Sequence, residues 1–90
     1  MPYIRAEERE RIDGAIEPLS AALRDMDAGA QNYVITRLLL SWVRARGVSY
    51  SNLADAIKIL ETAKLEFYRR ALAAYEDRKL REHGDVYGDL

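Results

Sequence analysis

The sequence contains no cysteine and a single histidine, His83. Without cysteine the chain cannot form disulfides, thiolate metal sites or a thiol nucleophile. One histidine cannot supply a metal site with two histidine ligands, and the acidic residues do not follow the spacing of a calcium-binding loop. No G-x-S-x-G stretch accompanies the histidine to indicate a catalytic serine. We therefore expect a protein that is not an enzyme and that holds no metal and no cofactor.

Long apolar runs and a strong positive charge are also missing. No run approaches the ~20 residues that a membrane-crossing helix needs, and the first residues, MPYIRAEERERID, are charged where a signal peptide would be apolar. We therefore expect a cytoplasmic protein that does not contact a membrane. Because the net charge is −1, we do not expect nonspecific binding of nucleic acid, which depends on a basic surface.

The composition is that of one small helical domain covering residues 1–90. Hydrophobic residues make up 49% of the sequence and charged residues 32%, a balance typical of soluble helical proteins. Eleven of the 14 basic residues are arginine, whose planar guanidinium binds phosphate or carboxylate through two parallel hydrogen bonds. The bias indicates either an anionic ligand or the base composition of a GC-rich genome.

The first helix is predicted at about residues 6–25. Apolar residues from Ile12 to Met26 recur at intervals of four and three, which places them on one helical stripe. Asp13 is a candidate N-cap, and Pro18 removes a backbone hydrogen bond inside the segment. We therefore expect a break near residues 13–18.

The second helix is predicted at residues 30–46. Gly29 is a candidate breaker before it, and Gly47 occupies the position after a helix where a positive φ is favoured. The apolar side chains of this segment, which surround Trp42, cover an arc of about 200° at 100° per residue. One neighbouring helix cannot cover so wide an arc.

The third helix is predicted at about residues 51–82, followed by an extended tail at 84–90. The sequence has no proline or glycine between Ser49 and Gly84, and Ser49 or Ser51 can cap the start. At ~1.5 Å per residue a helix of roughly 30 residues is ~45 Å long, more than the other helices can cover. We therefore predict an all-α, three-helix chain that assembles as a homo-oligomeric helical bundle, either a twofold dimer or a ring of dimers.

Two charged residues of the third helix, Glu61 and Lys64, fall inside its apolar arc, which allows two interpretations. They can form an intrahelical pair at the edge of the core, with the lysine ammonium turned to solvent. Alternatively, the helix lines a polar pocket between protomers, to which Tyr68 and Tyr75 also contribute and which Arg37 of the second helix faces. A buried charge must be paired or must bind a ligand, so the pocket would accept an anion.

The short stretches MPYI, NYVIT, LETAKLEFYRR, YED and GDVY span nearly the whole chain. Together they resemble a family of small proteins of unknown function that occurs in bacteria, archaea and tailed phages. The sequence departs from the family pattern at Ala74, where proline is expected, and at His83, where asparagine is expected, so the turn after the third helix is expected to differ. The resemblance implies no activity. If a phage encodes the chain, the host cytoplasm is its expected location.

The stretches that carry the resemblance coincide with polar positions that packing alone explains poorly. Together with Arg37 and Tyr75, six of these positions give a predicted ligand-binding set of eight residues: Tyr3, Asn32, Arg37, Glu61, Lys64, Tyr68, Arg69 and Tyr75. Arg24 is expected to lie outside this set. The set and the phage link favour a non-catalytic oligomer that sequesters a small anionic, nucleotide-like signal molecule, as phage sponge proteins do. The alternative is a module that binds a host or phage protein through the long helix.

Overall fold

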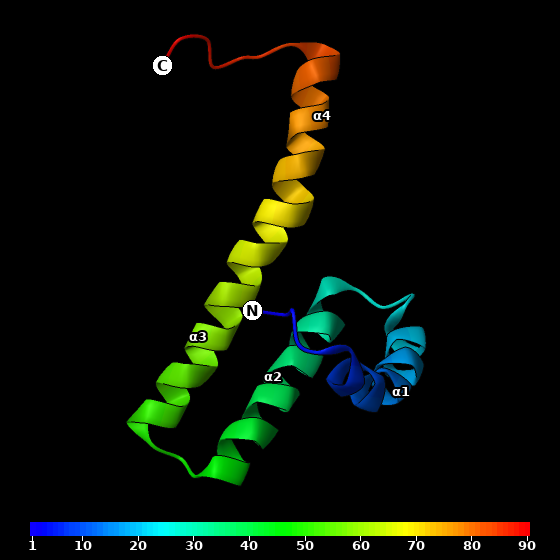
Figure 1. Ribbon diagram of the computed structural model, residues 1–90, viewed down its shortest axis with the longest axis vertical. Helices are drawn as coiled ribbons and strands as arrows, with labels where there is room; N and C mark the ends of the chain where they lie inside the picture. Colours follow the sequence, from blue (N-terminus) through cyan, green and yellow to red (C-terminus); the bar gives the residue numbers. More distant parts are fainter. The chain divides into compact units, whose positions relative to one another are not determined.

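The computed structural model describes residues 1–90 and contains helices without strands (Figure 1). The elements are α1 (Ala6–Leu23), α2 (Ala28–Arg46), α3 (Tyr50–Phe67), the π-helical turn η1 (Tyr68–Leu72) and α4 (Ala73–His83). Because α3, η1 and α4 follow one another without interruption, they form one long helix of 34 residues. The prediction of an all-α chain with three helices, the last of them long, is confirmed.

The chain divides into two compact units. One contains Pro2–Ile57, and the other contains Lys58–Leu90 together with Met1. The boundary falls inside α3, so the long helix contributes to both. The single domain expected for residues 1–90 stays a prediction.

Helix α1 is continuous from Ala6 to Leu23, so the predicted break near residues 13–18 is wrong. Arg5 is the N-cap residue, which also removes the capping role expected for Asp13. Pro18 lies inside the helix, where it leaves the carbonyl of Gly14 without its helical donor. The helix is continuous because the backbone hydrogen bonds on both sides of Pro18 are retained and only this one bond is lost.

The connection between α1 and α2 is fixed by two side chains. The Asp27 carboxylate accepts a hydrogen bond of 3.0 Å from the backbone N–H of Ala30 and so caps α2. The Gln31 side-chain amide donates to the carbonyl of Leu23 at 3.0 Å, which ties the end of α1 to the first turn of α2. Because the cap is Asp27, α2 begins before Gly29 rather than after it.

The connection between α2 and α3 follows the sequence prediction closely. Gly47 has a φ of 105° and ends α2, donating its N–H to the carbonyl of Val43 at 2.8 Å. The Ser49 hydroxyl accepts from the backbone N–H of Asn52 at 3.1 Å and caps the long helix. The Asn52 side chain donates to the carbonyl of Gly47 at 2.8 Å, which closes the turn.

Very little of the unit Pro2–Ile57 is buried. The two buried hydrophobic residues of the chain are Val43 in α2, which is 4% exposed, and Ala56 in α3, which is 8% exposed. The apolar side chains around the circumference of α2 remain in contact with solvent, among them Tyr33 and Leu38, each 59% exposed. The wide apolar arc predicted for this helix therefore has no cover on most of its sides.

The π-helical turn η1 is the feature of the long helix that the sequence does not announce. At its end the N–H of Ala73 donates to the carbonyl of Tyr68, five residues back instead of four. A turn that contains one extra residue rotates the following side chains by roughly 100° relative to a continuous α-helix. π turns of this kind are rare and occur frequently at functional sites.

Candidate functional site

The two charged residues singled out in the sequence form a salt bridge on α3. The Lys64 ammonium lies 3.1 Å from the Glu61 carboxylate, three positions apart on the helix. Their side chains are 67% and 54% exposed, respectively. In a single copy of the chain neither charge is therefore withdrawn from solvent, and the pair does not line a closed pocket.

Arg69 and Tyr75, on the same long helix, contact neighbours outside the predicted ligand-binding set. The Arg69 guanidinium lies 2.8 Å from the carboxylate of Glu66, whose side chain is only 24% exposed. The Tyr75 ring has the Arg78 guanidinium 5.6 Å and the Lys79 ammonium 5.5 Å from its centroid. Both sets of contacts are local to the long helix, between residues three or four positions apart.

The members of the set on α2 also make local contacts. The Arg37 guanidinium donates to the Tyr33 hydroxyl at 2.8 Å and lies 5.7 Å from the centre of the same ring. The backbone carbonyl of Asn32 accepts from the Thr36 hydroxyl at 2.9 Å, a bond within the helix. Tyr3 precedes α1 and is 51% exposed.

The predicted set is divided between the two units. Tyr3, Asn32 and Arg37 belong to the unit Pro2–Ile57, whereas the other five members belong to the unit Lys58–Leu90. Among those five, the salt bridge joins Glu61 to Lys64. The spacing of the residues along the helix explains that contact, whereas a ring of ligands around a common centre remains a prediction.

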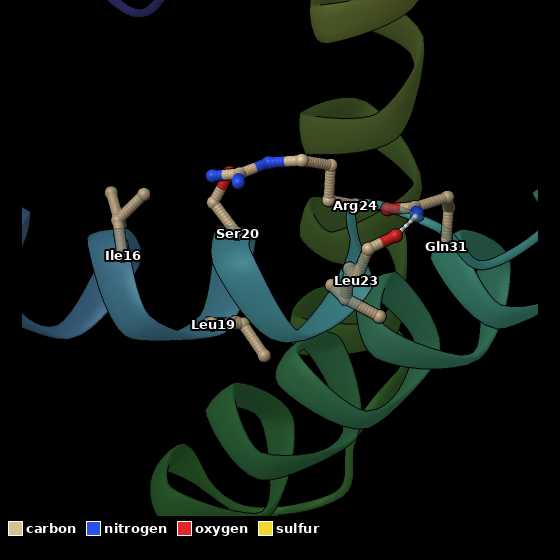
Figure 2. A pocket seen from close by; sticks show the side chains of 6 residues that line it. All are labelled: Ile16, Leu19, Ser20, Leu23, Arg24 and Gln31. Atoms are coloured by element: carbon tan, nitrogen blue, oxygen red, sulfur yellow. Dashed lines mark hydrogen bonds between the residues drawn. The ribbon is translucent and has the colours of Figure 1, made fainter.

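A surface depression that the sequence reasoning missed lies at the corner between α1 and α2 (Figure 2). Its lining consists of Ile16, Leu19, Ser20, Leu23, Arg24 and Gln31. Figure 2 shows the Arg24 side chain extending back over Ser20, while the Gln31 amide reaches the Leu23 carbonyl. Arg24, expected to lie outside the predicted ligand-binding set, therefore lines this depression. The α-helical spacing of Ile16, Leu19 and Leu23 in the sequence indicates that these residues share one side of α1. The sequence gives no indication that Gln31 lies beside them.

The structure meets the requirements of neither a metal site nor a membrane-crossing helix. Across residues 1–90, no three His, Cys, Asp or Glu side chains gather closely enough to hold a metal ion. No helix combines the length and the apolar character needed to cross a membrane.

Comparison with known proteins identifies the chain at the level of its family. No curated protein and no solved structure matches it. A family model described as a domain of unknown function, DUF6899, matches residues 1–86. This match includes α1, α2 and the whole long helix with its π turn. The chain therefore belongs to the DUF6899 family of domains of unknown function.

Proposed function

We propose that the chain is a non-catalytic, self-associating protein whose binding surface is the long helix. The observation that carries this proposal is the exposure of large apolar side chains along that helix in a single copy. Ten of them are between 40% and 72% exposed: Leu53, Ile57, Ile59, Leu60, Leu65, Phe67, Tyr68, Leu72, Tyr75 and Leu80. Apolar surface of this extent on a soluble helix marks a site of association.

The unit Lys58–Leu90 gives the argument in its simplest form. It consists of the greater part of the long helix and a tail, so it has no second helix of its own to pack against. A helix of this kind is stabilised mainly by tertiary or quaternary packing of its apolar face, because propensity alone leaves it marginal. Further copies of the chain, or a host or phage protein that offers an apolar groove, would supply that packing.

Sedimentation equilibrium at micromolar concentration tests the proposal. We expect a mass that is a multiple of 10.3 kDa and that falls toward the mass of one chain on dilution. A helical, monodisperse monomer throughout the dilution series would contradict self-association. In that case, the exposed face of the long helix would have to serve a different protein or none.

A second candidate function is the capture of a small anionic, nucleotide-like signal molecule, in the manner of a phage protein that blunts host defence. Arginine–aromatic pairs on α2 favour it. The Arg46 guanidinium lies 4.2 Å from the centre of the Trp42 ring, and Arg37 pairs with Tyr33. Such pairs offer a flat surface on which a base can stack and a cation for phosphate.

Thermal-shift screening with nucleotides and cyclic dinucleotides tests this second function. Ligand at 100 times its dissociation constant contributes about 2.7 kcal/mol, a shift of several degrees in so small a protein. The shift should shrink in Arg37→Ala and in Arg46→Ala, since these cations belong to the two arginine–aromatic pairs. Arg11→Ala is the matched control, because it removes the same charge from α1 at a residue outside the predicted set. Arg24→Ala is less suitable as a control, since Arg24 lines the depression between α1 and α2. A full panel without a shift would contradict ligand capture.

A further inference from the structure

Eight residues of the long helix follow a coiled-coil spacing of three and four. They are Lys58, Glu61, Leu65, Tyr68, Leu72, Tyr75, Lys79 and Glu82, and we call them the seam. Leucine and tyrosine occupy the middle of the seam, and one lysine and one glutamate stand at each end. All eight belong to the unit Lys58–Leu90, so their arrangement depends on that unit alone.

When the seam is read in reverse, each lysine falls opposite a glutamate and each leucine falls opposite a tyrosine. Each residue before Arg70 has a counterpart at the same distance after it, so that Glu61 corresponds to Lys79 and Lys58 to Glu82. Two copies aligned antiparallel about Arg70 therefore place unlike charges opposite each other at both ends. A parallel alignment would place each lysine opposite the same lysine and each glutamate opposite the same glutamate, which is repulsive.

The middle of the seam is available to a second copy. Leu65 and Tyr68 are 54% and 52% exposed, and Leu72 and Tyr75 are each 49% exposed. In the antiparallel alignment Tyr68 of one copy meets Leu72 of the other, and Leu65 meets Tyr75. Contacts between aromatic and aliphatic side chains of this kind exclude water from the centre of an interface.

The charged ends of the seam are exposed as well. The Glu61 and Glu82 side chains are each 54% exposed and that of Lys79 is 46% exposed. Glu61 and Lys79 already take part in local salt bridges of 3.1 Å, with Lys64 and Glu82 respectively. Such surface pairs contribute little to stability, so their side chains can also engage a partner at the edge of an interface.

The π turn η1 begins at Tyr68 and ends at Leu72, so it surrounds the point about which the pattern is symmetric. Because the turn rotates the following residues by roughly 100°, the halves of the seam before and after it face different sides of the long helix. Two copies that contact both halves therefore have to cross at the π turn, where Tyr68 and Leu72 meet, and cannot lie side by side along their whole length. Long lysine and glutamate side chains then reach across at the ends of the contact.

We propose that a second copy of the chain packs antiparallel on the seam, about a twofold axis at the π turn. The inference rests on the proposed self-association and specifies its partner, its orientation and the residues that meet. Its distinguishing element is charge: Glu61 of one copy pairs with Lys79 of the other, and the twofold axis makes each such pair occur twice.

Charge reversal tests the orientation. Glu61→Lys alone and Lys79→Glu alone each place like charges together twice per dimer, and each should weaken self-association about tenfold at low salt. The double variant, Glu61→Lys with Lys79→Glu, restores both pairs and should return the dissociation constant to within about threefold of the parent. Asp77→Lys and Arg81→Glu are the matched controls, since they make the same charge changes away from the seam and should leave association unchanged.

The outcomes separate this inference from the proposal beneath it. If the parent self-associates and the double variant is as weak as the single variants, the antiparallel seam is wrong while self-association stands. If the controls weaken association as much as the seam variants, the effect is one of net charge and the seam is again wrong. A parent that is monomeric at every concentration overturns both. Circular dichroism on each variant checks that the helices are retained.

Discussion

Truncating Leu72 to alanine should weaken self-association more than it weakens the folded chain. Leu72 is 49% exposed in a single copy, so about half of its side chain is still available for burial. Complete burial of a leucine contributes about 1.5–3 kcal/mol, so that the remaining half contributes about 1 kcal/mol in each copy. A dimer contains two such residues, and about 2 kcal/mol corresponds to a roughly 30-fold change in dissociation constant.

Sedimentation equilibrium over a dilution series measures this change directly. We expect Leu72→Ala to raise the dissociation constant between about 10-fold and 30-fold, since alanine keeps part of the contact. Ile12→Ala is the matched control: Ile12 is 45% exposed, and it lies on α1 rather than on the long helix. If Leu72→Ala left association unchanged, or if Ile12→Ala weakened it equally, the reasoning about the seam would be refuted.

Three further predictions concern stability. Pro18→Ala should raise the free energy of unfolding by about 1–3 kcal/mol in urea denaturation, because the interior of α1 regains a backbone hydrogen bond; an unchanged midpoint would mean that the proline is not costly there. Gly47→Ala should lower the free energy of unfolding by about 1–2 kcal/mol, because its φ of 105° strains any residue with a Cβ, and a neutral result would mean that the turn relaxes. A double-mutant cycle on Glu61 and Lys64 should give a coupling below about 1 kcal/mol, as expected for an exposed pair; a coupling of several kcal/mol would require a buried pair.

Local rules predicted much of the secondary structure because they act over only a few residues. The positive φ of Gly47 and the cap at Ser49 follow from side chains and backbone within one turn. The break near Pro18 was predicted wrongly because the free energy lost with one hydrogen bond is smaller than the free energy that the intact hydrogen bonds of α1 contribute together. The π turn had no sequence signal, since neither proline nor glycine marks it.

The candidate site was predictable only where contacts are local. The Glu61–Lys64 salt bridge follows from a spacing of three on a helix. The depression beside Arg24 depends on the direction in which α2 leaves α1, which the bond from Gln31 to Leu23 fixes and which no periodicity reveals. Contacts between copies depend on surfaces that a single sequence describes only as apolar or charged.

The π turn also gives the long helix one place where its length can change. Because η1 holds a residue more than an α-helical turn would, deleting one residue between Tyr68 and Leu72 can convert it into ordinary helix without breaking the flanking hydrogen bonds. The same deletion within α3 would rotate every later side chain by about 100°. Insertions and deletions in related chains are therefore expected to concentrate at this turn, where the side chains of α4 keep their direction relative to those of α3.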